Sequence, residues 1–564
     1  MNINSHRHWI PFAGYIAVAV VTTWPLATHL WGWVPGVGDW GQNMWALWWT
    51  RLSLLSLGQS PFFTRYLFYP EGVTLLFHPV DVADGLLAIP LWGVLGSDAS
   101  YNVMILLSFV LGGWGAYLLA LDLTGCRWAS FVAGLVFALS PYHFLRLQIG
   151  HLNLSTVQWI PFYSLFLLRF VRRGDWRSAG LAVFFLTWMA LHSWYYVVYC
   201  GMLSLVVLLW PLPPVRRAVS AGRVGLVLGG AVVILSPLLL PMFQLLGETT
   251  LVGEHDPLRH SVDVYSFFVP GPTSSWAEWF EDVWISYAAH NREPGASAYP
   301  GYVALVLALS GVVHQQWRRA VTWWWAVALL FTGLALGPQL QIDGQILPVS
   351  LPYRWLTQAI PIFAITGIPG RMVVITSLAL AMLTAYGLTG WLAKLNRSNI
   401  RWRMGVAVVL LVGLEYSAVP IQLTSTQTDE FYTRMGQDQE LYAVVDIKWD
   451  VNFLMHKQTI HGKPLIGGWL ARLPADKAAY LNQGGVDKTL LAFLVGLEWR
   501  QYTDPAALKA AVQAALSARQ VRYIIDHDNV AGAWIAELTG WPVVYESEGM
   551  VVYQNPIEEA WISR

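Results

Sequence analysis

A polar stretch directly after the first apolar run holds a residue that could act on a substrate. Asp39 stands between two glycines in Gly38-Asp39-Trp40-Gly41. A carboxylate in this setting could accept a proton from an attacking hydroxyl group, which is general-base catalysis. The alternative is structural, because an Asp directly before an amphipathic stretch often caps a helix. Residue type alone favours the cap.

Further along the same stretch lie three candidate ligands for a metal ion or for an acceptor. They are Glu71 in Tyr69-Pro70-Glu71-Gly72, and His78 and Asp81 in His78-Pro79-Val80-Asp81, with Asp84 close behind. Carboxylate oxygens suit Mg²⁺ and Mn²⁺, and imidazole is a borderline ligand. We therefore expect that this stretch could hold Mg²⁺ or Mn²⁺ beside a phosphate.

Two arginines are candidates for binding a phosphate. Arg371 ends the motif Gly367-Ile368-Pro369-Gly370-Arg371, at the entrance of a long apolar run, and Arg354 follows Pro352-Tyr353. The planar guanidinium matches phosphate oxygens bidentately, and a helix N-terminus adds favourable potential for an anion. The alternative is that each arginine only reaches towards lipid headgroups.

Further polar residues could line the same cavity. They follow the third apolar run or end the fifth: His143, Arg146, His151, Asn153 and His192, with Tyr142 beside them. The alternative for each histidine is an ordinary hydrogen-bonded side chain without a functional role.

The composition is that of a membrane protein. Only 12% of the 564 residues are charged and 55% are hydrophobic, whereas soluble domains carry about 25% charged residues. The net charge is zero, so nucleic acid is not expected as a partner. Two cysteines supply neither a disulfide framework nor a Cys-based zinc site.

Eleven apolar runs can each cross a bilayer, although several are shorter than the roughly 20 residues expected. They lie near 10–30, 101–121, 128–147, 154–171, 178–192, 195–212, 223–246, 299–314, 321–337, 372–394 and 404–420. The first run lacks a clear cleavage site and is interpreted as a retained signal anchor. The run 85–96 is short and contains a proline, which predicts an interfacial or re-entrant piece.

The distribution of Lys and Arg predicts the orientation in the cell membrane. Basic residues concentrate in one set of short loops, which should face the cytoplasm together with the N-terminus. The other side then carries three large loops, 31–100, 247–298 and 338–371. We expect a transmembrane domain over 1–424 and an extracytoplasmic α/β domain over 425–564. In the latter, the sequence predicts a helix at 505–519, a strand at 521–525 and a hairpin at 542–553.

A long first external loop with an acidic residue soon after the first span resembles the GT-C superfamily, the polytopic glycosyltransferases that use polyprenyl-phosphate or polyprenyl-diphosphate sugar donors. Asp39 matches the catalytic acidic residue of that loop. Many members have two adjacent acidic residues there, whereas Trp40 follows here, which leaves metal dependence open. The motif Gln458-Thr459-Ile460-His461-Gly462-Lys463-Pro464 also resembles uncharacterised bacterial membrane proteins grouped near this superfamily.

The resemblance implies that an acceptor hydroxyl attacks the anomeric carbon while the lipid phosphate leaves. Undecaprenyl phosphate is the expected carrier in a bacterial host, and Asp39 and Arg371 should then share one cavity outside the lipid. Two other classes stay open: a transporter or flippase of lipid-linked saccharides, and a non-catalytic assembly protein. A transporter would favour paired repeats and charges at the bilayer midplane, whereas the runs here are nearly free of charge, with Glu415 the main exception.

Overall fold

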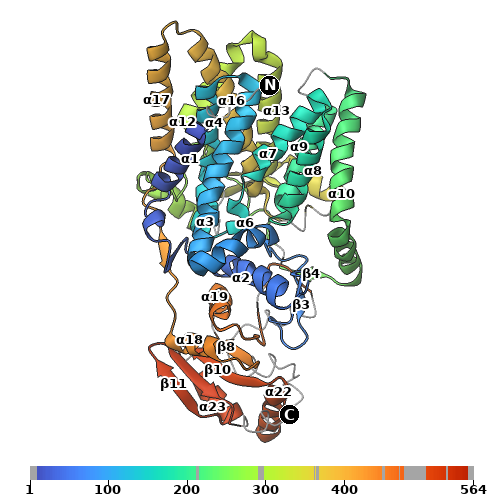
Figure 1. Ribbon diagram of the computed structural model, residues 1–564, viewed down its shortest axis with the longest axis vertical. Coiled ribbons are helices and arrows are strands. Elements are labelled where there is room, and N and C mark those ends of the chain that lie inside the picture. The colour runs from blue at the N-terminus through green and yellow to red at the C-terminus, as the bar shows by residue number, and fades with distance from the viewer. Residues whose placement is uncertain are drawn as a thin grey trace. The chain divides into compact units, whose positions relative to one another are not determined.

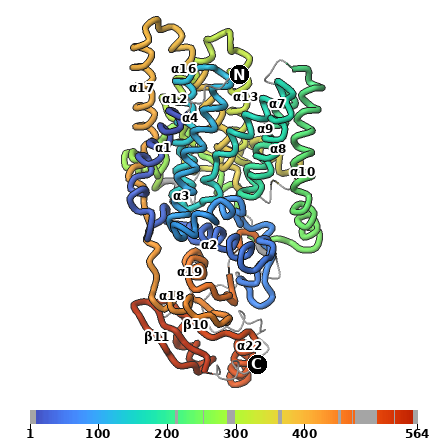
Figure 2. Tube along the Cα trace, viewed as in Figure 1, coloured from blue at the N-terminus to red at the C-terminus, as the bar shows by residue number. Residues whose placement is uncertain are grey.

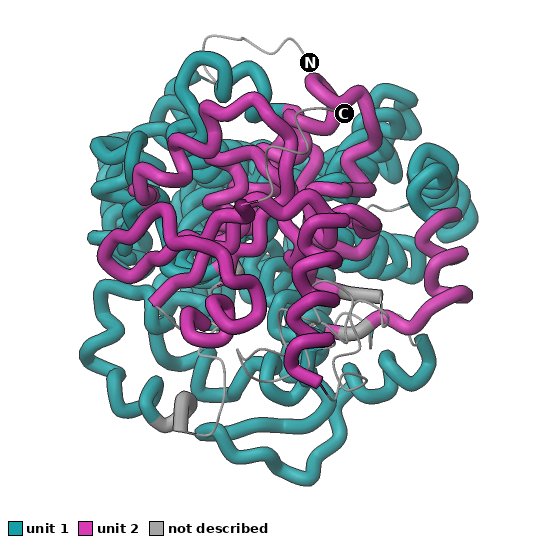
Figure 3. Tube along the Cα trace, turned by 90° about the horizontal axis from the view of Figure 1, so that it is seen from below, with its two compact units in different colours: residues 1–38, 87–239, 254–425 teal, residues 39–86, 240–253, 426–564 magenta. Residues whose placement is uncertain are grey.

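The chain forms two compact units, each assembled from segments far apart in the sequence. The computed structural model describes residues 9–210, 215–253, 255–289, 298–360, 363, 367–447, 451–468, 470–474, 504–528 and 531–556. Unit 1 comprises residues 1–38, 87–239 and 254–425, and unit 2 comprises residues 39–86, 240–253 and 426–564 (Figure 3). Residues 39–86, which belong to the predicted first external loop, group with residues 426–564 in unit 2. The predicted division into a transmembrane domain over 1–424 and an extracytoplasmic domain over 425–564 stays a prediction.

Unit 1 is built from helices, with two small two-stranded sheets. Its helices, two of which extend into unit 2, are α1 (Trp9–Thr22), α3 (Val82–Thr124), α4 (Arg127–Ala138), α5 (Pro141–Ile149), α6 (Leu152–Ser155), α7 (Trp159–Arg173), α8 (Trp176–Ala190), α9 (Trp194–Leu209), α10 (Arg217–Glu248), α11 (Glu281–Ala289), α12 (Tyr302–Ser310), α13 (Arg318–Ala335), α14 (Pro352–Ala359), α16 (Val373–Ala393) and α17 (Ser398–Glu415) (Figure 1). Strand β1 (Trp33–Pro35) pairs with β7 (Leu423–Ser425), and β5 (Gln339–Ile342) forms a hairpin with β6 (Gln345–Ser350).

Helix α16 is the centre of the packing in unit 1. It contacts α4, α12 and α13, which run beside it in Figure 2. A Cβ at Gly387 would lie 1.8 Å from the carbonyl oxygen of Leu307, so the glycine lets α16 and α12 approach closely. By contrast, only 17% of the apolar 18-residue stretch of α10 is buried inside the protein. Such a helix is expected to present its apolar side chains to lipid.

Five helical segments are long and apolar enough to cross a membrane: Val82–Thr124, Arg127–Ile149, Leu152–Arg173, Arg217–Glu248 and Pro369–Ala393. This confirms the predicted helical membrane architecture in its coarse form. Each of the eleven apolar runs overlaps a helix, but 10–30 continues past the end of α1, and 128–147 and 154–171 are each divided between two helices. The number of crossings and the orientation stay predictions.

The structure is consistent with a separate short piece at run 85–96, because a kink at Gly96 (φ 82°) divides α3 into two helical parts. The run is helical and ends at this kink, and its position at the membrane interface stays a prediction. Pro90 lies inside this helix. The positive φ of Gly96 interrupts the helical geometry. Only glycine adopts this backbone conformation without strain.

Unit 2 combines residues 39–86 and 240–253 with a small α/β fold in the C-terminal segment 426–564. Its remaining elements are α2 (Trp40–Arg51), β2 (Phe63–Thr64), β3 (Val73–Thr74), β4 (Leu251–Val252), α18 (Glu430–Gln437), β8 (Ala443–Ile447), α19 (Val451–His461), β9 (Leu473–Pro474), α22 (Pro505–Ala518), β10 (Val521–His527), α23 (Gly532–Thr539), β11 (Val543–Ser547) and β12 (Met550–Gln554). The four-stranded sheet has the order β11-β12-β10-β8, in which β8 and β10 are parallel and the other pairs antiparallel.

The helix, strand and hairpin predicted at 505–519, 521–525 and 542–553 are all present as α22, β10 and β11–β12. Local signals explain this agreement. Asp504 caps α22 by accepting a hydrogen bond from the amide of Ala506, and Pro505 occupies the first turn, where its missing N–H has no cost. Gly549 turns the hairpin with φ 78°.

Candidate functional site

Asp39 lies directly before α2, but its side chain does not cap that helix. The carboxylate oxygen Oδ1 instead accepts a hydrogen bond from Nδ2 of Asn452, at 3.2 Å. Asn452 is the second residue of α19, in the C-terminal segment of unit 2. The capping role favoured by residue type is therefore absent, and Asp39 has a tertiary partner.

The glycines beside Asp39 are explained by packing. A Cβ at Gly41 would lie 2.0 Å from the carbonyl oxygen of Asn452, and a Cβ at Gly38 would lie 2.7 Å from that of Ile149. Real Cβ atoms do not approach backbone this closely. The two glycines thus make room for neighbouring parts of the chain, with Gly38 packed in unit 1 and Gly41 in unit 2.

Helix α2 packs against α19 through a buried polar contact as well as through apolar surface. The indole Nε1 of Trp45 donates to Oε1 of Gln458 at 2.6 Å, and both side chains are fully buried. The Gln458 amide nitrogen donates to the carbonyl oxygens of Tyr66 (2.6 Å) and Lys463 (3.0 Å). Gln458 therefore joins α2, the loop after it and the end of α19.

The motif that begins at Gln458 forms the C-terminal end of α19. Gly462 adopts φ 66° after the last helical residue, as is common where helices end. The ammonium group of Lys463 donates to the carbonyl oxygens of Asp438 and Glu440, each at 2.6 Å. The motif thus anchors α19 to the remainder of the C-terminal segment.

Glu71, His78 and Asp81 do not form a common ligand set among the described residues. Glu71 is half-exposed and pairs with Arg519 (Oε1 to Nη2, 3.6 Å). His78 is buried, and its Nδ1 accepts a hydrogen bond from the amide of Ala471 at 3.2 Å. Burial lowers the pKa of His78 to about 3, so its imidazole is neutral at physiological pH.

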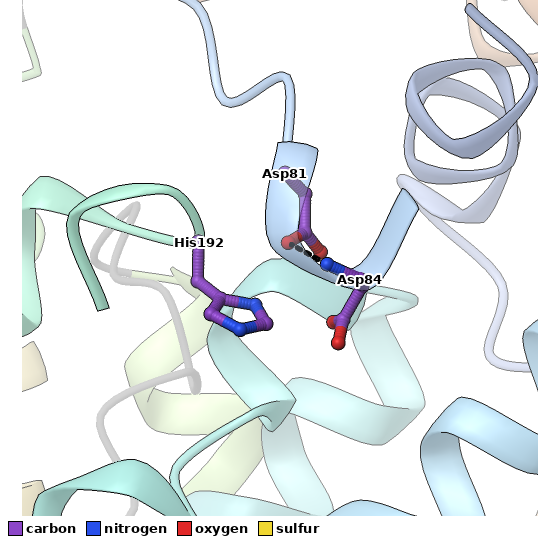
Figure 4. Close-up of side chains that lie close together, drawn as sticks. All are labelled: Asp81, Asp84 and His192. Atoms are coloured by element: carbon purple, nitrogen blue, oxygen red, sulfur yellow. Dashed lines mark hydrogen bonds between the residues drawn. The ribbon is translucent and has the colours of Figure 1, made fainter. Parts of the chain in front are cut away.

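Asp81 and Asp84 lie side by side, with their carboxylates close together (Figure 4). The amide of Asp84 donates to Oδ1 of Asp81 at 3.3 Å, and ligand oxygens of the two carboxylates lie within 4.8 Å of each other. Each residue is 1% exposed, and Asp81 holds a left-handed backbone conformation (φ 46°) before α3. Two buried carboxylates at this separation favour a proton or a cation between them.

Arg371 is a buried cation in unit 1. It lies in the single turn Pro369–Met372 that leads into α16 and is 9% exposed. Its guanidinium stacks over the ring of Tyr195, 4.3 Å from the centroid. Within the part of the chain that the structure describes, Arg371 makes no ion pair and its Nε has no hydrogen-bond partner.

A second buried arginine, Arg146, also lies in unit 1 with tyrosine neighbours. Its guanidinium lies 5.1 Å from the ring centroid of Tyr142, and its Nη1 lies 3.4 Å from Nδ1 of His151. The hydroxyl of Tyr142 hydrogen-bonds that of Tyr196 at 3.1 Å. The ring of Tyr199 lies 6.4 Å from those of Tyr196 and Tyr195, so a chain of aromatic contacts leads from Arg146 towards Arg371.

The remaining predicted residues of unit 1 are buried, and a functional role for them stays a prediction. His143 is fully buried, stacks on Phe109 and is 2.9 Å from the Ser108 hydroxyl. Asn153 is also buried. His192, labelled in Figure 4, accepts a hydrogen bond from the indole of Trp159 at 2.9 Å.

Arg354 differs from Arg371 in its surroundings. It is exposed on α14, and its Nη1 donates to the hydroxyl of Ser350 at 2.9 Å. An exposed guanidinium is already solvated by water, so Arg354 has less to gain from a phosphate than Arg371.

Sequence reasoning did not select Asn452 or Tyr195. Nothing local marks Asn452, because its relation to Asp39 depends on the packing of α19 against α2. A signal did exist for Tyr195: it belongs to Trp194-Tyr195-Tyr196 at the start of an apolar helix, where aromatic side chains can stack on a cation.

Comparison with known proteins gives a family and a fold. The model of a family described as a domain of unknown function (DUF6311) matches residues 11–415. The comparison with curated proteins finds no match. Among solved structures, arabinofuranosyltransferase AftD from Mycobacteria is similar with a TM-score of 0.57 and 12% identity, over 98% of this chain and 40% of AftD. This chain therefore spans about two fifths of the length of AftD.

Two further similar structures have lower TM-scores. The oligosaccharyltransferase AglB from Archaeoglobus fulgidus gives 0.49 at 11% identity, over 94% of this chain and 70% of AglB. ArnT from Cupriavidus metallidurans gives 0.47 at 13% identity, over 98% of this chain and 99% of ArnT. All three are GT-C glycosyltransferases. The similarity to AftD, at a TM-score of 0.57, shows that the chain has the GT-C fold.

Proposed function

Since the chain belongs to the DUF6311 family and has the GT-C fold, we propose that it is a membrane glycosyltransferase. It moves a sugar from a polyprenyl-phosphate carrier, undecaprenyl phosphate in a bacterial host, to an acceptor hydroxyl group at the extracytoplasmic face. Asp39 is the general base and Arg371 binds the phosphate of the donor.

The observation that carries this proposal is the environment of Arg371. The guanidinium is buried beside Tyr195, and no described carboxylate pairs with it. A buried charge without a counter-ion is costly, so the free energy of the protein favours an anionic ligand at this position. The phosphate of a lipid-linked sugar supplies that anion, and the fork of Arg371 can hold two of its oxygens.

In the reaction assigned to Asp39 and Arg371, one bond forms at the anomeric carbon and one breaks. The acceptor oxygen attacks the anomeric carbon, and its proton passes to the carboxylate of Asp39. The bond between the anomeric carbon and the phosphate oxygen breaks, and its electron pair leaves with the lipid phosphate. Arg371 stabilises the negative charge that grows on this leaving group.

Asp81 and Asp84 fit a divalent cation. Their carboxylates are buried, with oxygens within 4.8 Å of each other, and such hard oxygen ligands suit Mg²⁺ or Mn²⁺. When bound, the ion would supply positive charge to neutralise a phosphate. The two carboxylates would hold the ion in place, and Glu71 and His78 have protein partners of their own.

The test is Asp39→Asn, assayed for sugar transfer from a panel of polyprenyl-phosphate pentoses and hexoses. Loss of a general base lowers turnover by ~10²–10⁴-fold, and we expect a loss in this range. Asp256→Asn, which changes an exposed carboxylate, should keep activity. Full activity of a folded Asp39→Asn protein would remove Asp39 from the mechanism. Translocation of the donor without release of lipid phosphate would instead indicate a transporter.

A further inference from the structure

We infer that Asn452 is a positioning residue for the base Asp39, and that α19 of the C-terminal segment is therefore part of the catalytic machinery. This inference rests on the proposed function of Asp39. It assigns a role to a segment that could otherwise serve only to display a domain to partners.

The hydrogen bond between the two side chains is the first observation. Nδ2 of Asn452 donates to Oδ1 of Asp39 at 3.2 Å. A carboxylate oxygen accepts such a hydrogen bond along its lone-pair direction, so the amide N–H can fix the orientation of the carboxylate. A neutral donor also favours the ionised carboxylate, which is the form that a general base needs.

The second observation is that helix packing sets the place of Asn452. Gly41 in α2 lies directly against the backbone of Asn452, since a Cβ there would be 2.0 Å from its carbonyl oxygen. The ring of Trp40 lies 4.8 Å from that of His456, one turn further along α19. The contact between Trp45 and Gln458 follows at 2.6 Å. Successive turns of two helices thus hold the amide of Asn452 beside Asp39, which is what a catalytic carboxylate requires.

The third observation connects this pair to the rest of the C-terminal segment. Lys463 donates to the carbonyl oxygens of Asp438 and Glu440, and the guanidinium of Arg522 in β10 pairs with the side chains of the same two residues. The strand β10 also lies beside β8 in the sheet. A displacement of this sheet would therefore be transmitted through α19 to Asn452.

A residue that only packs would behave differently from a positioning residue. Asn452 is only partly buried, so removal of its amide would have a smaller effect on stability than the loss of a fully buried side chain. An effect on the pH dependence of turnover would arise only if the side chain acts on the ionisation or orientation of Asp39.

The experiment compares Asn452→Ala, Asn452→Ser and Asn452→Asp in the full-length protein, with sugar transfer followed across pH. We expect Asn452→Ala to lower kcat about tenfold with little change in KM, and Asn452→Ser, which keeps a short donor, to retain more activity. Asn452→Asp places a second carboxylate beside Asp39, so the acid limb of the pH–rate profile should move up by about one pH unit. Gln437→Glu adds the same charge at an exposed position and should leave the profile unchanged.

The outcomes separate this inference from the proposed function. If Asp39→Asn is inactive while all three Asn452 variants keep the kcat and pH profile of the unchanged protein, the inference is overturned and the proposed function stands. If Asp39→Asn is active, the proposed function itself fails. Thermal unfolding of each variant shows whether it is folded. If Asn452→Asp does not fold, the kcat values of Asn452→Ser and Asn452→Ala test the positioning role.

Discussion

The guanidinium of Arg371 lies 4.3 Å from the centroid of the Tyr195 ring, which joins the entrance of α16 to the start of α9. A guanidinium over an aromatic face is held by its flat surface, and its N–H groups point outward along its edge. The arrangement is suited to bidentate binding of a phosphate. In the proposed reaction, the ring of Tyr195 orients the cation, and the lipid phosphate supplies its counter-charge.

Arg371→Ala is expected to lower kcat/KM for the lipid-linked donor by about 10- to 100-fold, since hydrogen bonds to charged groups contribute about 1.5–3 kcal/mol. Arg371→Lys keeps the charge but loses the planar fork and should give an intermediate loss. Tyr195→Phe keeps the aromatic face and serves as the matched control, with activity near that of the unchanged protein. Steady-state kinetics with varied donor concentration measures these effects. Equal donor dependence in the Ala variant and the unchanged protein would exclude the phosphate role.

Much of the fold could be predicted because its signals are local. Long apolar runs predict helices, and each of the eleven runs overlaps at least one helix. In the C-terminal segment, Asp504 and Pro505 mark the start of a helix, and Gly549 marks a hairpin turn. The short length of the run 85–96 and its proline predict a break, and α3 does break at Gly96, although Pro90 itself lies within the helix.

The arrangement around Asp39 could not be predicted in the same way. Asp39 contacts Asn452, and Gly41 is needed for this approach. The two residues are far apart in the sequence, and no periodic pattern connects them. Only the tertiary packing of α2 on α19 determines which side chain meets the carboxylate.

Unit 2 should lose stability in mild acid because it buries three neutral histidines. Burial lowers the pKa of His78 and of His456 to about 3 and that of His461 to about 4, with the charge of Lys457 adding to the effect on His456. The unfolded chain binds protons below pH 6.5, whereas the folded chain does not until pH 3–4. The stability is therefore fully present above pH 6.5 and falls as the pH decreases towards 4, by up to about 1.4 kcal/mol per histidine and pH unit.

The loss of stability is measured as the fall in unfolding temperature in detergent as the pH decreases from 7.5 to 5. His456→Phe keeps a ring against Trp40 but removes one titrating group, so its unfolding temperature should fall less steeply with pH. His29→Asn changes an exposed histidine and should keep the full slope. A slope that is unaffected by His456→Phe would show that His456 is not neutral and buried in the folded protein.

Gln458→Leu is expected to destabilise the protein by about 2–6 kcal/mol. Leucine has a similar volume but leaves the indole N–H of Trp45 and the carbonyl of Lys463 without their partner, and each unsatisfied buried group costs about 1–3 kcal/mol. Gln439→Leu changes an exposed glutamine and is the matched control. Unfolding by heat in detergent, at one scan rate for both variants, gives the comparison. Equal unfolding temperatures would contradict the buried role of Gln458.

Gly41→Ala tests whether the approach of α19 to α2 matters for catalysis. In an exposed helix, Gly→Ala stabilises by up to about 1 kcal/mol, and Gly93→Ala in α3 should do so because nothing lies within 4 Å of its Cβ position. At Gly41 the added methyl group would meet the carbonyl oxygen of Asn452 at 2.0 Å, so one helix must move. The movement shifts the amide of Asn452 away from Asp39, and we expect a lower kcat as well as a lower unfolding temperature. A Gly41→Ala protein as stable and active as the Gly93→Ala protein would show that the two helices do not pack this closely, and that Asn452 does not orient the base.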